Sequence, residues 1–273
     1  MKKLLIPIFL LFHSVVFSQI NTDSLMNVLL HSKKFKHVGS VGYLMKHFQK
    51  FKTTDGLENY DVYMDSRKKL KEYMGLSIVY KQYDKQGRIA KRIGYSLKGK
   101  YSLWDYSPIE IMSYSKDTAT TEYYNSAYIL TDKITEIKDT LGRLIETLEY
   151  DKHLNPMSRT VSGYTDSLNE VLIKYYDGQG KFRINSQGVA IRRQKFDTIN
   201  KKFIIEEYFY DSTMKLVDAD HENLGGNNGT SLNYSEIKNH IESGETISSY
   251  YNSKGVLICK KSGVEVIIES IEK

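Results

Sequence analysis

The sequence predicts a mainly β protein with an α-helical N-terminal segment, in which consecutive antiparallel β-hairpins form a twisted repeat sheet. Two observations indicate this class. Eighteen of the 22 tyrosines lie beyond Gly75, among many isoleucine, valine and threonine residues, and aromatic and β-branched side chains favour strands. A short turn signal of aspartate and glycine also recurs along the same part of the chain, as expected where hairpins follow one another.

Residues 1–18 have the pattern of a secretory signal peptide. Two lysines precede an apolar run from Leu4 to Phe17, and Ser18 is small enough for cleavage before Gln19. The run is shorter than the roughly 20 residues that a membrane-spanning helix needs. We therefore expect an exported protein, located in the periplasm, at the cell surface or outside the cell, with no transmembrane segment after cleavage.

Residues 19–75 are predicted to form a helical N-terminal segment. Thr22, Asp23 and Ser24 offer N-cap side chains, and apolar residues then recur at helical spacings of three and four. These apolar residues are Leu25, Val28, Leu29, Val41, Leu44, Met45, Phe48 and Phe51. We expect two or three short helices that cover one face or one end of the sheet, because a long apolar strand must be covered or paired.

Residues 76–273 are predicted to form the β-hairpin repeat domain, beginning with a strand at Leu76–Tyr83. The recurring turn signal contains an aspartate or asparagine and, three residues later, a glycine. The clear copies are Asp84 with Gly87, Asp139 with Gly142, Asp177 with Gly180, and Asn252 with Gly255. In degenerate copies that start at Asp151, Asp197 and Asp211, the glycine is replaced by Leu154, Asn200 and Met214.

This spacing has a physical reason. The first side chain can accept a hydrogen bond from a backbone N–H two residues later. The glycine supplies the positive φ that a type I turn with a bulge requires when it closes a hairpin. The aromatic and branched residues on either side then form cross-strand pairs worth about 0.2–1 kcal/mol each. We interpret these aspartates as turn formers rather than catalysts.

The motif of aromatic residue, aspartate, two residues, glycine, basic residue and branched residue resembles the YD repeat of RHS-type exported proteins. The resemblance covers roughly residues 76–261, with about seven residues per copy. It implies a twisted sheet of consecutive hairpins. The copies are irregularly spaced and too few for the large shells of that family, and no toxin module follows Gly255.

Charge and cysteine content exclude several classes of function. Without residues 1–18, the chain has 37 basic and 33 acidic residues, and the excess lies in residues 19–74. The densest basic cluster, residues 67–71, is typical of a solvated surface rather than of the dense basic face of a nucleic-acid binder. Cys259 is the only cysteine, so no intramolecular disulfide and no cysteine-based zinc site can form.

The richest polar segment is residues 218–229, which contains the candidate metal ligands Asp218, Asp220 and Glu222. An oxygen-rich loop with glycines is suited to calcium, but the spaced ligands of an EF-hand are missing. A solvated connecting loop is the simpler interpretation. No phosphate-binding loop or nucleophile elbow occurs either, and we expect no catalytic residues and no cofactor.

The leading hypothesis is an exported, non-enzymatic β-hairpin repeat protein that acts as a binding or structural module at the cell envelope or outside the cell. Its partner is expected to be a protein or a glycan that lies against the tyrosine-rich sheet or its edge. One alternative is a secreted hydrolase or metal-dependent enzyme with a site near residues 218–229. Another is an immunity or delivery partner of a toxin, which only the family resemblance suggests.

Overall fold

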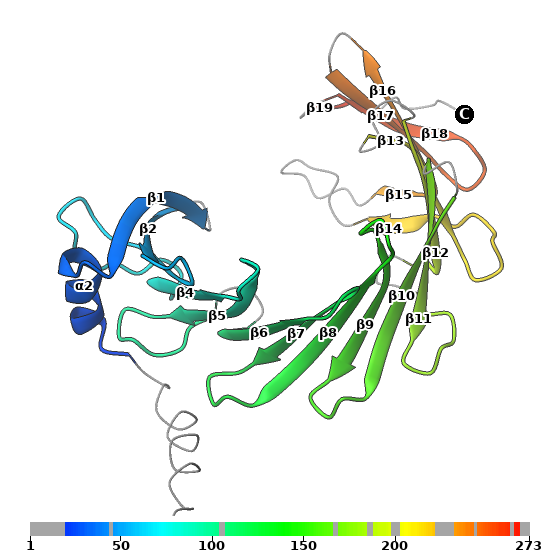
Figure 1. Ribbon diagram of the computed structural model, residues 1–273. Coiled ribbons are helices and arrows are strands. Elements are labelled where there is room, and N and C mark those ends of the chain that lie inside the picture. The colour runs from blue at the N-terminus through cyan, green and yellow to red at the C-terminus, as the bar shows by residue number, and fades with distance from the viewer. Residues whose placement is uncertain are drawn as a thin grey trace, which may run out of the picture. The chain divides into compact units, whose positions relative to one another are not determined.

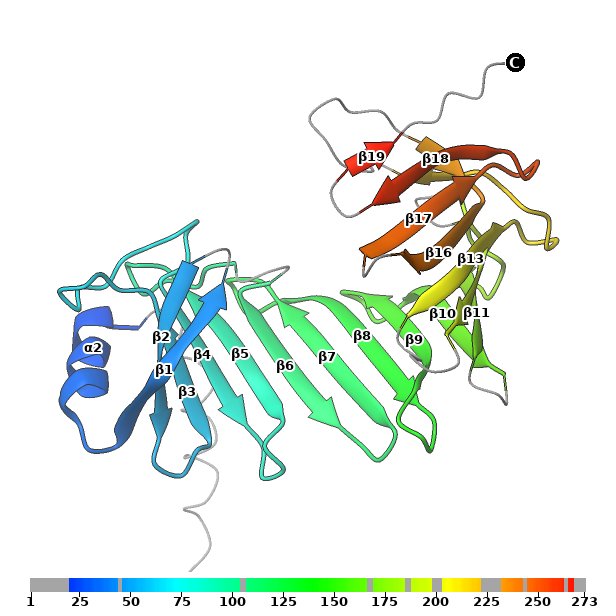
Figure 2. The ribbon, with the colours of Figure 1, turned by 90° about the horizontal axis from the view of Figure 1, so that it is seen from above.

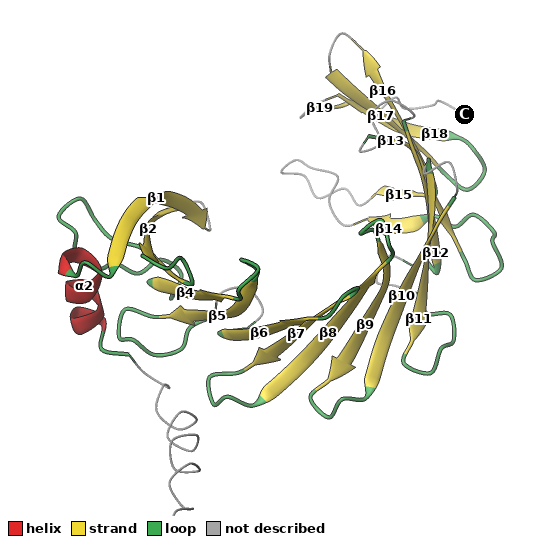
Figure 3. Cartoon of the chain, in the orientation of Figure 1, coloured by secondary structure: helices red, strands yellow, loops and turns green. Residues whose placement is uncertain are grey.

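The protein is mainly β, with one short helix among the described residues, and its strands form a twisted, unclosed antiparallel sheet (Figures 1 and 3). The computed structural model describes residues 20–43, 46–103, 107–165, 169–184, 188–197, 203–221, 232–242, 245–262 and 265–267. The predicted fold class and its hairpin-repeat character are confirmed. The predicted signal peptide lies outside the described residues.

The chain divides into two compact units, Met1–Ile134 and Thr135–Lys273. The first unit contains the helix and the strands up to β7, which lie side by side in Figure 2. Its elements are α2 (Thr22–His31), β1 (Phe35–Tyr43), β2 (Lys46–Thr53), β3 (Glu58–Val62), β4 (Ile78–Tyr83), β5 (Ile89–Tyr95), β6 (Ile109–Tyr114) and β7 (Thr118–Tyr124). From β1 to β7, each strand pairs antiparallel with the next along the chain.

Strand β8 (Leu130–Lys138) spans the boundary between the units, and the remaining strands belong to the second unit. They are β9 (Leu144–Asp151), β10 (Pro156–Tyr164), β11 (Glu170–Asp177), β12 (Ile191–Phe196), β13 (Ile204–Tyr210), β14 (Ala219–His221), β15 (Leu232–Tyr234), β16 (Glu236–Glu242), β17 (Glu245–Tyr251), β18 (Leu257–Ser262) and β19 (Glu265–Ile267). Strands β14 and β15 form a separate two-stranded sheet.

The prediction of helices across residues 19–75 is correct only for α2. The rest of that segment contains β1, β2 and β3. Phe48 and Phe51 belong to β2, where residues three apart lie on opposite faces, and both side chains are buried, in different clusters. A strand buried on both faces therefore produced the spacing that we had assigned to a helix. The helix itself is capped by Asn21, whose side chain accepts from the Ser24 N–H at 2.9 Å.

Helix α2 covers one face of the first unit's sheet, as predicted. The register places Phe51, Tyr60, Tyr80, Ile93 and Ile109 in one row across β2 to β6. The buried helix residues, Met26 and Leu29, belong to the same hydrophobic cluster as this row. Burying a side chain of this size contributes about 1.5–3 kcal/mol, so apolar burial holds the helix in place.

The opposite face of the same strands carries charged side chains that pair with one another. Lys81 Nζ lies 2.9 Å from Asp61 Oδ2, and Arg92 Nη1 lies 3.3 Å from Glu110 Oε2. The Asp61 side chain is fully buried, and only 6% of the Glu110 side chain is exposed. Buried charges are stable only when they are paired, so these two ion pairs are part of the interior of the first unit.

The turn at Asp84 shows how the hairpins are closed. The Asp84 N–H donates to the Arg88 carbonyl at 2.8 Å, and the Gly87 N–H donates to the Asp84 carbonyl at 3.0 Å. Asp84 Oδ1 accepts from the N–H groups of Gln86 and Arg88, both at 2.9 Å. Gly87 has φ +76°, and a Cβ added there would meet nothing within 4 Å. Glycine is therefore favoured at this position by backbone conformation and not by lack of space.

The same set of two backbone and two side-chain hydrogen bonds recurs in seven further turns among the described residues. These turns begin at Asp65, Asn125, Asp139, Asp151, Asp177, Asp211 and Asn252. The left-handed fourth position holds glycine in four of the eight turns and Lys68, Tyr128, Leu154 or Met214 in the others. Asn200, the corresponding residue of the Asp197 copy, lies outside the described residues.

Two of the turns share a further contact with a tyrosine of the next hairpin. The Arg88 guanidinium lies 4.3 Å from the Tyr114 ring centroid, and the Tyr114 hydroxyl donates to the Ile89 carbonyl at 2.8 Å. Arg143 lies 4.4 Å from the Tyr164 ring centroid in the same way. Cation–π contacts of this kind contribute about 0.5–1 kcal/mol at exposed sites. The basic residue of the motif thus links one hairpin to the next.

Candidate functional site

A pocket of about 530 Å³ lies beside α2 in the first unit. Helix α2, strands β1 and β2, and the turn after β3 all contribute to it. Its lining residues are Leu29, Leu30, Phe35, His37, Gln49, Phe51, Met64, Asp65, Ser66 and Lys68. The four elements follow one another along residues 29–68, but their lining residues are separated in sequence. The fold of this segment therefore brings them together.

The inner part of this pocket is apolar. Leu29 and Phe51 are buried members of the core cluster, and Leu30, Phe35 and Met64 pack against that cluster while staying partly exposed. The helix and the strands hold these side chains through the core. Apolar, largely preformed concavities with a few polar groups are typical ligand sites.

The rim of the pocket is polar. His37 Nε2 and Gln49 Oε1 lie 2.7 Å apart, and the His37 ring meets the Phe51 ring at 5.4 Å in an edge-on arrangement. Asp65 and Lys68 come from the turn after β3, in which Lys68 has φ +60°. The Lys68 side chain is exposed and, within the described part of the chain, has no ion pair. The rim thus offers one amide, one imidazole and one ammonium group to a ligand.

Asp65 closes its turn and is not available for acid–base chemistry. Its Oδ1 accepts from the N–H groups of Lys69 and Arg67, each at 2.9 Å, and its Oδ2 lies 3.6 Å from the Lys71 ammonium. The hydrogen bond from the Lys69 N–H, together with that of Arg67 and the charge of Lys71, lowers the pKa of this carboxyl below its ordinary value. The carboxylate is therefore charged and engaged at neutral pH.

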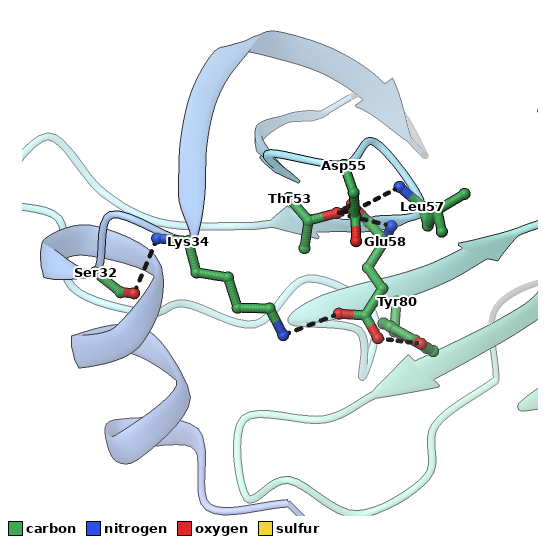
Figure 4. Close-up of polar contacts among 7 residues, drawn as sticks. All are labelled: Ser32, Lys34, Thr53, Asp55, Leu57, Glu58 and Tyr80. Carbon is green, nitrogen blue, oxygen red and sulfur yellow. Dashed lines mark hydrogen bonds and ion pairs between the residues drawn. The ribbon is translucent and has the colours of Figure 1, made fainter.

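A polar network next to the pocket fixes the start of β1 against the sheet (Figure 4). Lys34 Nζ lies 3.6 Å from Glu58 Oε2, and the Tyr80 hydroxyl donates to Glu58 Oε1 at 3.2 Å. The Lys34 N–H donates to Ser32 Oγ at 3.1 Å. Burial raises the pKa of Tyr60 to about 12 and also raises the pKa of Tyr80. Both phenols therefore remain protonated at neutral pH, and the network positions side chains rather than transferring protons.

The candidate metal ligands of residues 218–229 are placed only in part. Asp218 Oδ1 accepts from the Ser253 N–H at 2.6 Å, and its Oδ2 accepts from Ser253 Oγ at 3.2 Å. This carboxylate thus attaches its segment to the turn between β17 and β18. The side chain of Asp220 and the whole of Glu222 lie outside the described residues. Among the residues that are described, no three His, Cys, Asp or Glu side chains are grouped closely enough to hold a metal ion.

The tyrosine-rich part of the second unit carries a ladder of charges. Arg193 pairs with Glu170 at 2.7 Å, Lys195 pairs with Glu206 at 2.5 Å, and the Tyr208 hydroxyl donates to Glu206 at 3.0 Å. Each charge is compensated by a neighbour on an adjacent strand. We interpret this ladder as cross-strand stabilisation of the sheet.

A polar cluster around the buried side chains of Glu207 and Gln194 lies in the second unit. Glu207 accepts hydrogen bonds from Arg192 and from Gln194, the latter at 2.6 Å.

Cys259 is 1% exposed, and burial raises the pKa of its thiol. A buried, protonated thiol is a poor nucleophile, so Cys259 has the environment of a packing residue.

The eight predicted turn residues all lie at hairpin ends. Asp84, Asp139, Asp177 and Asn252 use a side-chain oxygen to accept backbone N–H bonds. Gly87, Gly142, Gly180 and Gly255 occupy the left-handed positions, with φ between +76° and +80°. Sequence reasoning did not find the pocket, because its residues come from separate elements and form no motif.

The comparisons give no relative from which a role could be transferred. No helix within the described part of the chain is both long and apolar enough to cross a membrane. No protein-family model matches the chain, and no curated protein is similar enough to count as a match.

Proposed function

We propose that this protein is an exported binding module in which the hairpin sheet is the scaffold and the pocket beside α2 is the ligand site. The observation that carries the proposal is the pocket itself, with an apolar interior formed by core side chains and a polar rim. Its volume of about 530 Å³ falls within the roughly 300–1,000 Å³ of typical ligand sites. The partner is a protein or a glycan of the cell envelope or the surroundings.

Two features of the sequence support export and the scaffold role. The lysines and apolar run of residues 1–18 have the order of a signal peptide. The repeated turn motif resembles that of YD-repeat proteins, which are exported. The turn residues are occupied in closing hairpins, and the charges of Glu170, Arg193, Lys195 and Glu206 in the second unit are compensated across neighbouring strands, so the pocket is the site best suited to a ligand.

The binding proposal is tested by blocking the pocket from its rim. Ser66 is exposed and follows Asp65 in the turn, so Ser66→Trp fills the pocket without removing a core side chain. Ser212 has the corresponding position after Asp211 and makes Ser212→Trp a matched control. Immobilised protein beginning at Gln19 is incubated with an envelope extract. We expect the Ser66 variant to lose partners that the wild type and the Ser212 variant retain.

Equal capture by all three proteins would contradict the pocket as the site. Export is tested separately by expressing the full chain and sequencing the N-terminus of the protein outside the cytoplasm. An N-terminus at Gln19 is expected. Protein found only in the cytoplasm with Met1 still attached would contradict export and leave the binding result unaffected.

A further inference from the structure

The pocket lies in the positively charged part of the chain. Residues 19–74 contain ten lysines and arginines but only six aspartates and glutamates. Three of those acids are already engaged. Asp61 is buried against Lys81 from outside this segment, Glu58 is bonded to Lys34 and Tyr80, and Asp65 is bonded within its turn. Because only Asp61 is compensated by a base outside the segment, ten basic residues stand against the five remaining acids, and this positive excess favours an acidic ligand.

Strand β1 provides a second feature of a peptide site. Among the described strands it pairs with β2 alone, so one edge of its backbone is free to accept an added strand. Residues 36–40 of β1 are exposed. Phe35 and His37, on the same strand, line the pocket. An extended segment that adds to β1 would thus pass beside the apolar interior.

We propose that this site binds an extended acidic peptide segment of a partner protein, with one large apolar side chain of that segment inserted among Leu30, Phe35 and Met64. The acidic residues of the peptide on either side of the apolar anchor lie beside three exposed lysines. These are Lys68 on the rim, Lys33 just before β1, and Lys36 within β1. This inference rests on the proposed function and names the chemistry of its partner.

The lining favours a peptide over a sugar or a small ion. The inner residues are mostly aliphatic, whereas sugars are held by dense polar groups and exposed aromatic faces. Phe51 is almost fully buried, and Phe35 is already in edge contact with Tyr60 at 5.6 Å. An apolar anchor with flanking charges matches both the interior and the rim, and the free strand edge supplies main-chain hydrogen bonds.

The test uses labelled synthetic peptides and the protein that begins at Gln19. The acidic probe alternates glutamate with valine around a central phenylalanine. One control peptide has lysine in place of every glutamate, and another has alanine in place of the phenylalanine. By fluorescence anisotropy at low salt, we expect the acidic probe to bind about tenfold more tightly than either control, with binding that weakens as salt is added.

Two protein variants locate the binding. Lys68→Asn removes the charge while keeping a residue that tolerates the left-handed conformation. Lys85→Asn is a control for charge alone, because it removes an exposed lysine from a different position of the turn at Asp84. We expect the Lys68 variant to lose about threefold in affinity, as for one solvent-exposed charge, and Ser66→Trp to abolish binding. The Lys85 variant should bind like the wild type.

The outcomes separate the two proposals. If the acidic and basic peptides bind equally but Ser66→Trp still blocks both, the pocket is a binding site and the acidic chemistry is wrong. If Ser66→Trp has no effect on the acidic probe, or if the probe does not bind at all, the peptide site is wrong. Loss of binding by both lysine variants to the same extent would show unspecific charge attraction and would also overturn it.

Discussion

At the scale of single residues, the turns are determined by one side-chain oxygen and one left-handed backbone position. The aspartate or asparagine could be recognised from the sequence wherever a glycine followed three residues later. Copies without glycine could be recognised only where an aromatic residue precedes aspartate, as at Asp151 and Asp211. Asp65 follows a methionine, and Asn125 is not an aspartate, so with Lys68 and Tyr128 at the left-handed positions the sequence does not indicate these two turns. The hydrogen bonds of the first side chain suffice to hold such a residue at positive φ, which explains why the repeat looks degenerate in sequence and regular in structure.

The left-handed position makes a stability prediction. Leu154 has φ +63° and is 52% exposed, so it is strained and contributes little packing. We expect Leu154→Gly to raise the free energy of unfolding by about 1 kcal/mol. A non-glycine residue costs about 1–2 kcal/mol in this left-handed conformation, and the larger conformational entropy that glycine loses on folding offsets part of the gain. The reverse change, Gly142→Ala, should lower it by a similar amount. Urea unfolding measures both, and an unchanged midpoint for both would contradict the turn geometry.

The turn carboxylates predict loss of stability in acid. The hydrogen bond from the Arg143 side chain, with the backbone N–H groups of Arg143 and Leu141, lowers the pKa of Asp139 from its ordinary value of 3.8. A folded-state pKa below the unfolded value stabilises the fold above about pH 4, and this contribution is lost as the pH falls through the folded pKa. We expect Asp139→Asn to unfold with a smaller difference in urea midpoint between neutral pH and about pH 3 than the wild type.

The natural turn at Asn252 supplies the converse control. Its side chain makes the same backbone bonds without a charge, so Asn252→Asp should make stability more sensitive to acid. If both substitutions leave the acid dependence unchanged, the turn carboxylates are not the titrating groups.

At the scale of elements, the sequence predicts those strands that have one buried face. It does not always distinguish a helix from a strand that is buried on both faces. Strand β4 begins at Ile78, inside the segment predicted from Leu76 to Tyr83. In strand β2, Phe48 and Phe51 are both buried. Their spacing of three satisfies a helical pattern, and only the neighbours on each face reveal the strand.

Helix α2 predicts a contrast between two of its residues. Leu29 is 2% exposed and packs into the first unit's core, whereas Val28 is 39% exposed. We expect Leu29→Ala to lower the free energy of unfolding of that unit by about 2–5 kcal/mol and Val28→Ala to change it by less than about 0.5 kcal/mol. Thermal unfolding provides the comparison. Similar shifts for the two variants would mean that the helix does not pack as described.

At the scale of the whole molecule, the two compact units have separate hydrophobic cores. Met26, Leu29 and Val62 belong to the core of the first, and Phe209 and Tyr250 to that of the second. The sequence did not indicate this division, because the boundary falls within β8 and no linker composition marks it. The cores arise from side chains that lie side by side on several neighbouring strands, which a repeat pattern of a few residues does not specify.

Separate cores predict separate responses to mutation. We expect Leu29→Ala to increase amide hydrogen exchange mainly within residues 20–134 and Phe209→Leu to increase it mainly within residues 135–262. Mass spectrometry of peptides from the exchanged protein resolves the two ranges. Equal acceleration in both ranges by either variant would show that the chain unfolds as one cooperative body.

The central claim is that each aspartate or asparagine turn reverses the chain between paired strands. Nuclear magnetic resonance of the protein beginning at Gln19 tests it most directly, through cross-strand contacts between Tyr83 and Ile89 and the backbone angles of Gly87 and Gly142. We predict close cross-strand proton pairs and positive φ at both glycines. Helical chemical shifts through these residues, or no contact between the flanking strands, would contradict the account.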